Sequence, residues 1–177
     1  MSRGKSAEAQ LAGFLAKYDA EIAELAESSR AEMRRFYPTA LELVYDNYNA
    51  LVIGFGPTER ASDAIFSIAF YPKWVSLFFL QAQGLPDPDK ILKGSGSVAK
   101  HVVLATADVL HYPAVRALMQ EAEIRAKVAF DPGGEHRLII KSVSAKQRPR
   151  RPVDKNAAVR AGKKSNVKTP LSGADGL

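Results

Sequence analysis

The chain of 177 residues contains no cysteine, which excludes disulfide bonds, thiolate metal sites and a cysteine nucleophile. Histidine is also scarce: His101, His111 and His136 fall in different predicted elements and lack the spacing of metal ligands. The Gly-x-Ser-x-Gly turn of hydrolases is absent, and so is the Gly-x-x-x-x-Gly-Lys loop that binds nucleotide phosphates. We therefore expect a protein that is not an enzyme, with no catalytic residues, no metal site and no cofactor.

Long hydrophobic runs are absent as well. The longest strongly apolar run, 74–80, is interrupted by Ser76 and is far shorter than the ~20 residues that span a bilayer. The first ten residues include Arg3 and Lys5 but no apolar core of a signal peptide. Together with the lack of cysteine, these features predict a cytoplasmic protein that has no membrane partner.

An excess of positive charge is missing from most of the chain, although the formal net charge is +6. Residues 1–140 carry 15 Lys and Arg against 17 Asp and Glu, whereas residues 141–177 carry 10 Lys and Arg against 2 Asp. From residue 146 onward there are few large apolar side chains, so this part cannot bury enough surface to offset the entropy of ordering. We therefore predict one domain over residues 1–145 and a disordered basic tail over residues 146–177.

The tail predicts an electrostatic partner, because a flexible cationic segment associates with polyanions by counterion release without reading sequence. A solubilising tail is the alternative interpretation. Aromatic residues are absent from the tail, so base stacking is not expected of it. The candidate contacts to nucleic acid are Arg148, Arg150, Arg151, Lys155, Lys163 and Lys164.

Helical periodicity predicts two helices at the start and one later. Leu11, Leu15 and Tyr18 share one face of the first helix, and Asp19 is a candidate N-cap for the second, which ends before Pro38. One continuous helix through residues 18–19 is the alternative. Proline suits the first helical position, so the later helix is predicted to begin at residue 113 and to run to about residue 127. Its predicted inward-facing residues are Val115, Leu118, Met119 and Ala122.

Five strands are predicted from β-branched and aromatic runs that are bounded by turn residues. Their links are too short for crossovers, so we expect antiparallel pairing and an α+β fold, in which the sheet packs against the helices. Strand 74–80 is apolar on both faces, which indicates a buried core strand or, second, a homodimer contact. The predicted strands are 43–55, 64–71, 74–80, 100–105 and 137–143.

Four features over residues 11–127 resemble the YdhG-like domain family, a widespread bacterial family of uncharacterised proteins, domain of unknown function 1801. They are the helix ending before Pro38, the Glu-Leu-Val-Tyr-Asp-Asn-Tyr-Asn-Ala strand at 42–50, the Phe-Tyr-Pro-Lys-Trp-Val-Ser-Leu-Phe-Phe hairpin at 70–79 and the Lys-Gly-Ser-Gly-Ser turn at 93–97. The resemblance implies an α+β fold and brings no catalytic residues. Part of the family is described as a frataxin-like iron chaperone, so the resemblance also implies iron as a ligand to consider.

Polar and aromatic residues early in the first predicted strand indicate a small ligand pocket, with a half-exposed strand start as the plain alternative. The turn at 93–97 is the best candidate for an anion site, because its glycines let backbone amides converge beside lysines; a solvated turn is the alternative. We expect a small polar or anionic ligand in one pocket that joins both features. The candidate ligand-binding residues are Tyr45, Asp46, Tyr48, Asn49, Trp74, Lys93, Ser95, Ser97 and Lys100.

Overall fold

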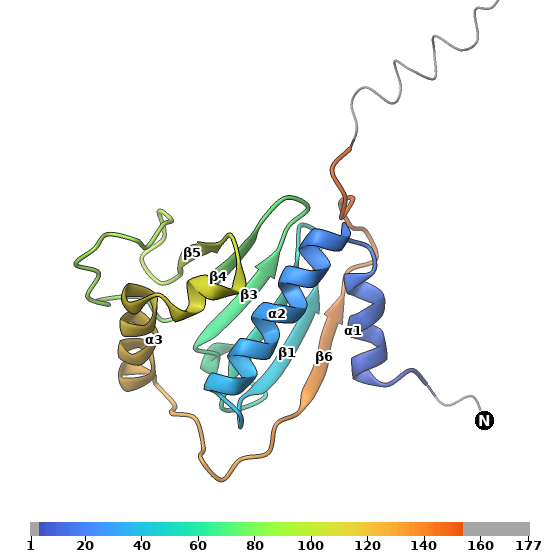
Figure 1. The fold of residues 1–177 in the computed structure, drawn as a ribbon. Helices are drawn as coiled ribbons and strands as arrows, with labels where there is room; N and C mark the ends of the chain where they lie inside the picture. The colour runs from blue at the N-terminus through green and yellow to red at the C-terminus, as the bar shows by residue number, and fades with distance from the viewer. Residues whose placement is uncertain (1–3, 154–177) are drawn as a thin grey trace, which may run out of the picture.

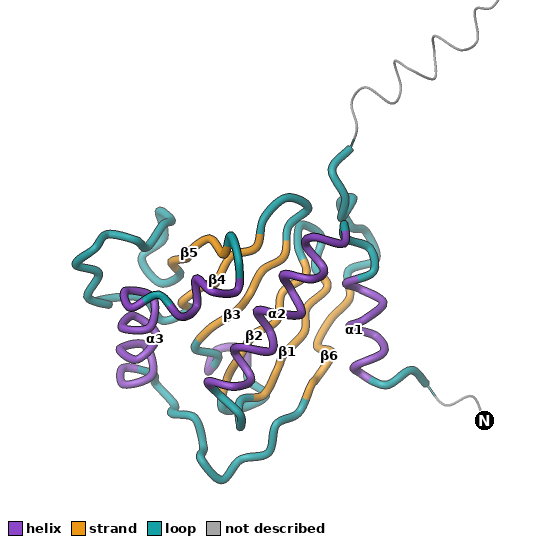
Figure 2. Tube along the Cα trace, viewed as in Figure 1, coloured by secondary structure: helices purple, strands orange, loops and turns teal. Residues whose placement is uncertain are grey.

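The computed structural model describes residues 4–153, and these form an α+β fold with three α-helices and one six-stranded sheet in the order β5-β4-β3-β2-β1-β6. Figures 1 and 2 show the helices gathered on one side of the sheet, with α2 lying across it. No helix among these residues is long and apolar enough to cross a bilayer. In chain order the elements are α1 Ala7–Leu15, α2 Ala20–Phe36, β1 Leu41–Asp46, β2 Leu51–Gly56, the 3-10 turn η1 Ala61–Asp63, β3 Phe66–Phe70, β4 Val75–Phe79, β5 Lys100–Leu104, the 3-10 turn η2 Ala107–His111, α3 Pro113–Arg125 and β6 Leu138–Val143.

The two opening helices are separate, as predicted. Ser6 caps α1 by accepting a hydrogen bond from the Ala9 amide at 3.2 Å. Asp19 holds the N-cap position of α2, but its carboxylate makes no capping hydrogen bond, so the predicted cap is right in position and wrong in chemistry. Helix α3 begins with Pro113 at its first turn, and the four residues predicted to face inward are all buried.

The core lies between the helices and one face of the sheet. The strand register aligns Val44, Ile53, Ile68, Leu77 and Val102 across five neighbouring strands, and all five are buried. Side chains alternate in a strand, so this row defines the face that the helices cover. Strand β4 lies between β3 and β5, and its residues Val75, Leu77 and Phe79 belong to the core, which fits the buried-strand interpretation.

The predicted long strand 43–55 is wrong, because it is two strands joined by a turn. Strands β1 and β2 pair antiparallel, and the amide of Asn47 donates to the carbonyl of Ala50 at 3.0 Å to close the connection. The residues Asp-Asn-Tyr-Asn at 46–49 are typical of turns, since Asp and Asn side chains bond to nearby backbone and tolerate turn geometry. The sheet therefore has six strands, and Tyr48 and Asn49 lie in a turn at its end.

The last strand also departs from the prediction, because β6 pairs with β1 in parallel. The expectation of antiparallel pairing rested on short links, but the chain between β5 and β6 includes η2 and α3 and is long enough for a crossover. Parallel pairing at the edge of a mostly antiparallel sheet leaves the α+β class unchanged. It also brings the end of β6 beside Asp46 at the end of β1.

Strand β1 carries two buried carboxylates, Glu42 and Asp46. Glu42 holds α2 against the sheet through Arg30 at Oε2 and Arg34 at Oε1, and the Nε2 atom of His136 lies 2.7 Å from the same Oε1 atom. Buried carboxylates are stable in a protein when they are paired and hydrogen-bonded in this way. Asp46 has the corresponding role at the opposite end of β1, where it holds the C-terminal segment.

Candidate functional site

The C-terminal segment, residues 144–153, is fixed on the body by Asp46. The Nη2 atom of Arg150 lies 2.8 Å from Oδ1 of Asp46, and the Nζ atom of Lys17 lies 2.8 Å from Oδ2. Arg150 is only 4% exposed and also donates to the carbonyls of Asn47 and Tyr48. The predicted start of a disordered tail at residue 146 is therefore wrong by at least eight residues, because an arginine in this stretch is buried in a defined pairing.

The same contacts set the protonation behaviour of Asp46. Burial by itself raises the pKa of this carboxyl, but hydrogen bonds from Lys17, Gln147 and Arg150 outweigh burial and hold the pKa below its usual value. Asp46 is therefore charged across the neutral range and fully engaged by protein groups. Both of its carboxylate oxygens are paired with protein cations, Oδ2 with Lys17 and Oδ1 with Arg150, and its assignment as a ligand-binding residue stays a prediction.

Two turns meet the C-terminal segment at this end of the sheet. The β3–β4 turn has Pro72 at its second position, which type I and II turns favour, and the amide of Tyr71 donates to the carbonyl of Trp74 at 2.9 Å. The rings of Tyr71 and Trp74 stack with centroids 4.9 Å apart and planes 24° apart. Trp74 is nevertheless 48% exposed, so one face of a large aromatic surface is left open to solvent.

A concave site, which we call the Trp74 hollow, forms where these segments meet. Its volume is about 710 Å³, within the usual range of small-molecule sites. Among the described residues, three cationic side chains and no carboxylate contribute to its lining. The hollow is lined by Asn49, Tyr71, Pro72, Lys73, Trp74, Arg148, Pro149, Arg151, Pro152 and Val153.

The arginines of the hollow are held by different contacts. The guanidinium of Arg148 lies 5.5 Å from the ring centroid of Tyr48, and its amide donates to the Tyr48 carbonyl at 2.9 Å. Arg151 donates to the carbonyl of Lys17 at 3.3 Å and lies 3.6 Å from Asp19. An open indole face beside several cations can stack on a flat ring and attract an anion attached to it.

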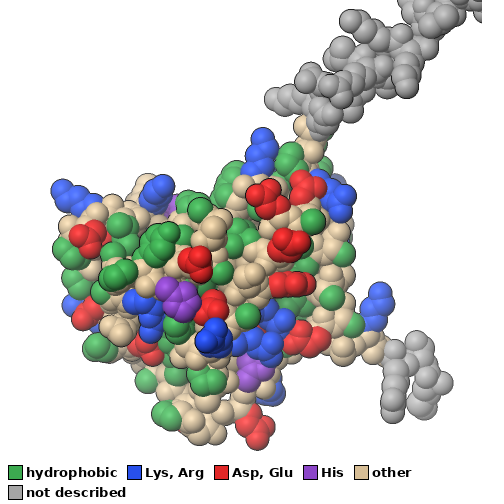
Figure 3. Space-filling model, in the orientation of Figure 1, with side chains coloured by type: hydrophobic (Ala, Val, Ile, Leu, Met, Phe, Trp, Pro, Cys, Tyr) green, Lys and Arg blue, Asp and Glu red, His purple; other side chains and the backbone are tan. Residues whose placement is uncertain are grey.

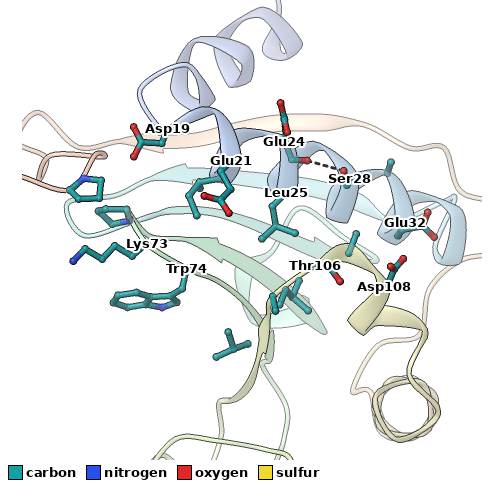
Figure 4. A pocket seen from close by; sticks show the side chains of 18 residues that line it. Asp19, Glu21, Glu24, Leu25, Ser28, Glu32, Lys73, Trp74, Thr106 and Asp108 are labelled. Atoms are coloured by element: carbon teal, nitrogen blue, oxygen red, sulfur yellow. Dashed lines mark hydrogen bonds between the residues drawn. The ribbon is translucent and has the colours of Figure 1, made fainter.

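A second concavity, which we call the acidic groove, adjoins the hollow. It has a volume of about 1050 Å³ and lies between α2, the β3–β4 turn and the η2 region (Figure 4). Five carboxylates line it against a single lysine, Lys73. Its lining residues include Asp19, Glu21, Ile22, Glu24, Leu25, Glu32, Lys73, Trp74, Leu104, Asp108 and Pro152.

The structure brings together some of the residues predicted for a ligand pocket and separates the others. Asn49 and Trp74 line the Trp74 hollow, and Tyr48 lies beside it through Arg148. Lys100 pairs with Phe79 at the opposite end of β4, and its Nζ atom donates to the carbonyl of Gly94 at 2.7 Å. Lys93, Ser95, Ser97 and Lys100 therefore lie away from the hollow, and the expected single pocket does not form.

Tyr45 lies outside the hollow as well. It alternates with Val44 of the core face, so its side chain leaves the opposite face of the sheet. Its hydroxyl is buried without a hydrogen-bond partner among the described residues, and burial raises its pKa. Of the residues predicted for nucleic acid, Arg148 and Arg151 line the hollow, Arg150 is buried against Asp46, and Lys155, Lys163 and Lys164 lie outside the described residues.

Sequence reasoning missed Tyr71 and Lys73, although a signal for them was present. Tyr-Pro-Lys-Trp at 71–74 is a four-residue turn between two apolar strands. Aromatic residues at the two ends of such a turn are cross-strand neighbours on one face, so they can stack. Across residues 4–153, no three His, Asp or Glu side chains are grouped so that they could hold a metal ion.

Comparisons with protein-family models, with curated proteins and with solved structures give no match for this chain.

Proposed function

We propose that this protein is a non-enzymatic binding module, of the YdhG-like kind that its sequence resembles, and that the Trp74 hollow binds a small anion bearing a flat ring. The observation that carries the proposal is the half-exposed indole of Trp74 beside Lys73, Arg148 and Arg151 in one hollow, whose lining within residues 4–153 includes no carboxylate. Nucleoside phosphates are the simplest ligands with this chemistry.

The proposal is supported by how firmly the hollow is built. Two of its walls are tight turns at the end of a six-stranded sheet, and the third is fixed by the buried pair of Asp46 and Arg150. A preorganised site binds with little ordering cost, so a modest number of contacts gives useful affinity. The stacked ring of Tyr71 supports the indole from one side, which leaves the other side for a ligand.

The test uses Trp74 itself, because it is the single tryptophan of the chain and its fluorescence reports directly on the hollow. We expect saturable quenching by a nucleoside monophosphate and weaker binding of the uncharged nucleoside and of inorganic phosphate. Lys73→Ala should weaken the nucleotide and leave the nucleoside unchanged. Lys100→Ala, which removes a lysine of β5 that pairs with the far end of β4, is the matched control. Equal binding of nucleotide and nucleoside would contradict the proposed role of the cations.

A second candidate function is association with single-stranded nucleic acid. The observation that favours it is that Arg148 and Arg151 belong to the segment that leads directly into the basic residues 154–177. Trp74 supplies the aromatic platform that the tail itself lacks, so base stacking becomes available to this part of the molecule. An oligonucleotide should then quench Trp74 with an affinity that falls steeply as salt is raised, whereas a mononucleotide should show a shallower dependence.

A further inference from the structure

The acidic groove combines an apolar floor with a rim of negative charge. Ile22 and Leu25 of α2 contribute to this floor, together with Leu104 at the end of β5 and Trp74 of the β3–β4 turn. In Figure 4 the side chains of Glu21 and Leu25 point from α2 toward the gap above Trp74, while Thr106 and Asp108 come from the opposite wall. Figure 3 shows the acidic side chains gathered along this part of the surface. A groove of this kind fits an extended segment that carries both cations and small apolar side chains.

Several of the rim carboxylates are without a counterion among residues 4–153. Asp19 lies near Arg151, and Glu32 contacts both Arg35 and His111. By contrast, Glu21, Glu24 and Asp108 have no cation within 4.0 Å among the described residues. The groove therefore has a net negative charge that the described part of the chain does not balance.

The described chain stops beside this groove. Pro152 lines it, and Val153 is the last described residue. Residues 154–177 continue with five basic residues against two aspartates and include small apolar side chains such as Val159 and Val167. From Asp19, the N-cap of α2, to Glu32 is 13 residues, or about 20 Å at 1.5 Å per residue of helix. Six or seven residues of the C-terminal segment would cover about that length if they were extended. The basic residues in question are Lys155, Arg160, Lys163, Lys164 and Lys168.

We propose that residues 154–177 bind in the acidic groove of their own chain, with their cations against Glu21, Glu24 and Asp108 and a valine on the floor formed by Ile22 and Leu25. Tethering converts this contact into an intramolecular one with an effective concentration in the millimolar range, so weak ion pairs suffice. A polyanion that binds the tail competes with the groove for the same cations. The proposal does not depend on any ligand of the Trp74 hollow.

The experiment is paramagnetic relaxation in the full-length chain. Because the chain has no cysteine, Ser165→Cys provides a single site for a nitroxide next to Lys163 and Lys164. We expect the label to broaden amide signals of residues 21–32 and 103–108, and reduction of the nitroxide to restore them. At 1 M salt, where the Debye length is about 3 Å, the broadening should be lost.

Two controls separate this docking from its alternatives. Glu21→Gln with Asp108→Asn should abolish the broadening at the groove, whereas Glu27→Gln with Glu135→Gln, two exposed carboxylates outside it, should leave it intact. Mixing isotope-labelled chain without nitroxide with spin-labelled chain of natural isotopes tests contacts between copies. Broadening in that mixture would overturn the proposal in favour of docking between molecules. Uniform or absent broadening in the single-chain experiment, or broadening that survives the groove variant, would overturn it as well.

Discussion

The Trp74 hollow and the acidic groove share Pro72, Lys73, Trp74 and Pro152, yet they present opposite charges. The hollow is cationic because the C-terminal segment brings two arginines to one side of the β3–β4 turn. The groove is anionic because α2 and η2 bring carboxylates to the other side. One indole therefore borders two surfaces that would attract different partners.

The comparison shows that a division of charge along a chain does not determine where the charge lies in space. The sequence is basic at its end and near neutral before it, which predicts a basic appendage on a neutral body. The fold instead places the first basic residues of that end against the body, where Arg150 is buried and Arg148 and Arg151 become part of a site. Asp46 is responsible for this placement, because it pairs with Arg150 and so fixes the segment on the body.

The largest expected effect therefore comes from breaking the pair of Asp46 and Arg150. Asp46→Ala leaves Arg150 buried without its counterion, and removing one partner of a buried pair costs about 3–5 kcal/mol. We expect a fall of that size in the free energy of unfolding, measured by urea denaturation, together with loss of the hollow. The exposed pair of Arg137 and Glu59 is the matched control, and Glu59→Ala should cost less than about 1 kcal/mol. Similar losses for both variants would contradict a structural role for Asp46.

Removing the shared indole should have the next largest effect, and on binding more than on folding. Trp74→Ala should weaken ligand binding to the hollow by about 1–3 kcal/mol, or roughly fivefold to 150-fold, because stacking is lost. The melting temperature should change little, since half of the indole is already exposed. Calorimetric titration measures the affinity in the absence of the tryptophan signal. Trp74→Phe should keep most of the affinity for the ligand. If Trp74→Ala unfolds instead, Trp74 is a core residue and not a binding residue.

Lowering the pH should weaken the pair of Asp46 and Arg150, with a smaller effect on stability than its removal. The pKa of Asp46 in the folded chain lies below its usual value near 3.8, so the charged form of this carboxyl stabilises the folded state at neutral pH. Its contribution is fully present above pH about 4 and is lost as the pH falls through the folded pKa. We expect the difference in stability between the wild type and Asp46→Asn to shrink as the pH is lowered from 5 to 2. A constant difference across that range would exclude titration of Asp46 as the cause.

Much of the fold was predictable because local signals agreed with the tertiary structure. Pro113 and the apolar spacing after it indicate α3 and its buried face, and the Tyr71–Trp74 turn separates two strands that do pair. The turn at 47–50 was missed because the β-prone residues on either side of it form one continuous run in the sequence. Its residues Asn47 and Asn49 fit the polar face of a strand, but asparagine is equally typical of a turn.

The site could be predicted only in part, because it depends on pairings between distant residues. Asp46 and Arg150 are 104 residues apart, and they meet only because the crossover through α3 brings β6 beside β1 in parallel. An arginine between prolines in a basic run resembles a solvated tail residue, and arginine is rarely buried unless it is paired. Trp74 and Asn49 do line one hollow, whereas the turn at 93–97 belongs to the other end of the sheet.

The smallest expected effect tests whether the turn at 93–97 is separate from the Trp74 hollow. Lys93→Ala with Lys100→Ala removes both lysines that flank the predicted anion turn, and we expect less than a twofold change in the affinity of the Trp74 hollow for a nucleoside phosphate. The first reason is distance, because Lys100 pairs with Phe79 at one end of β4 and Trp74 lies beyond the other end. The second is that the Nζ atom of Lys100 already donates to the carbonyl of Gly94. Long-range attraction from exposed lysines is screened beyond about 8 Å at physiological salt, so repeating the titration at higher salt should remove any residual difference. A loss as large as that of Lys73→Ala would mean that both ends of the sheet contribute to one ligand, and the hollow would then be only part of the site.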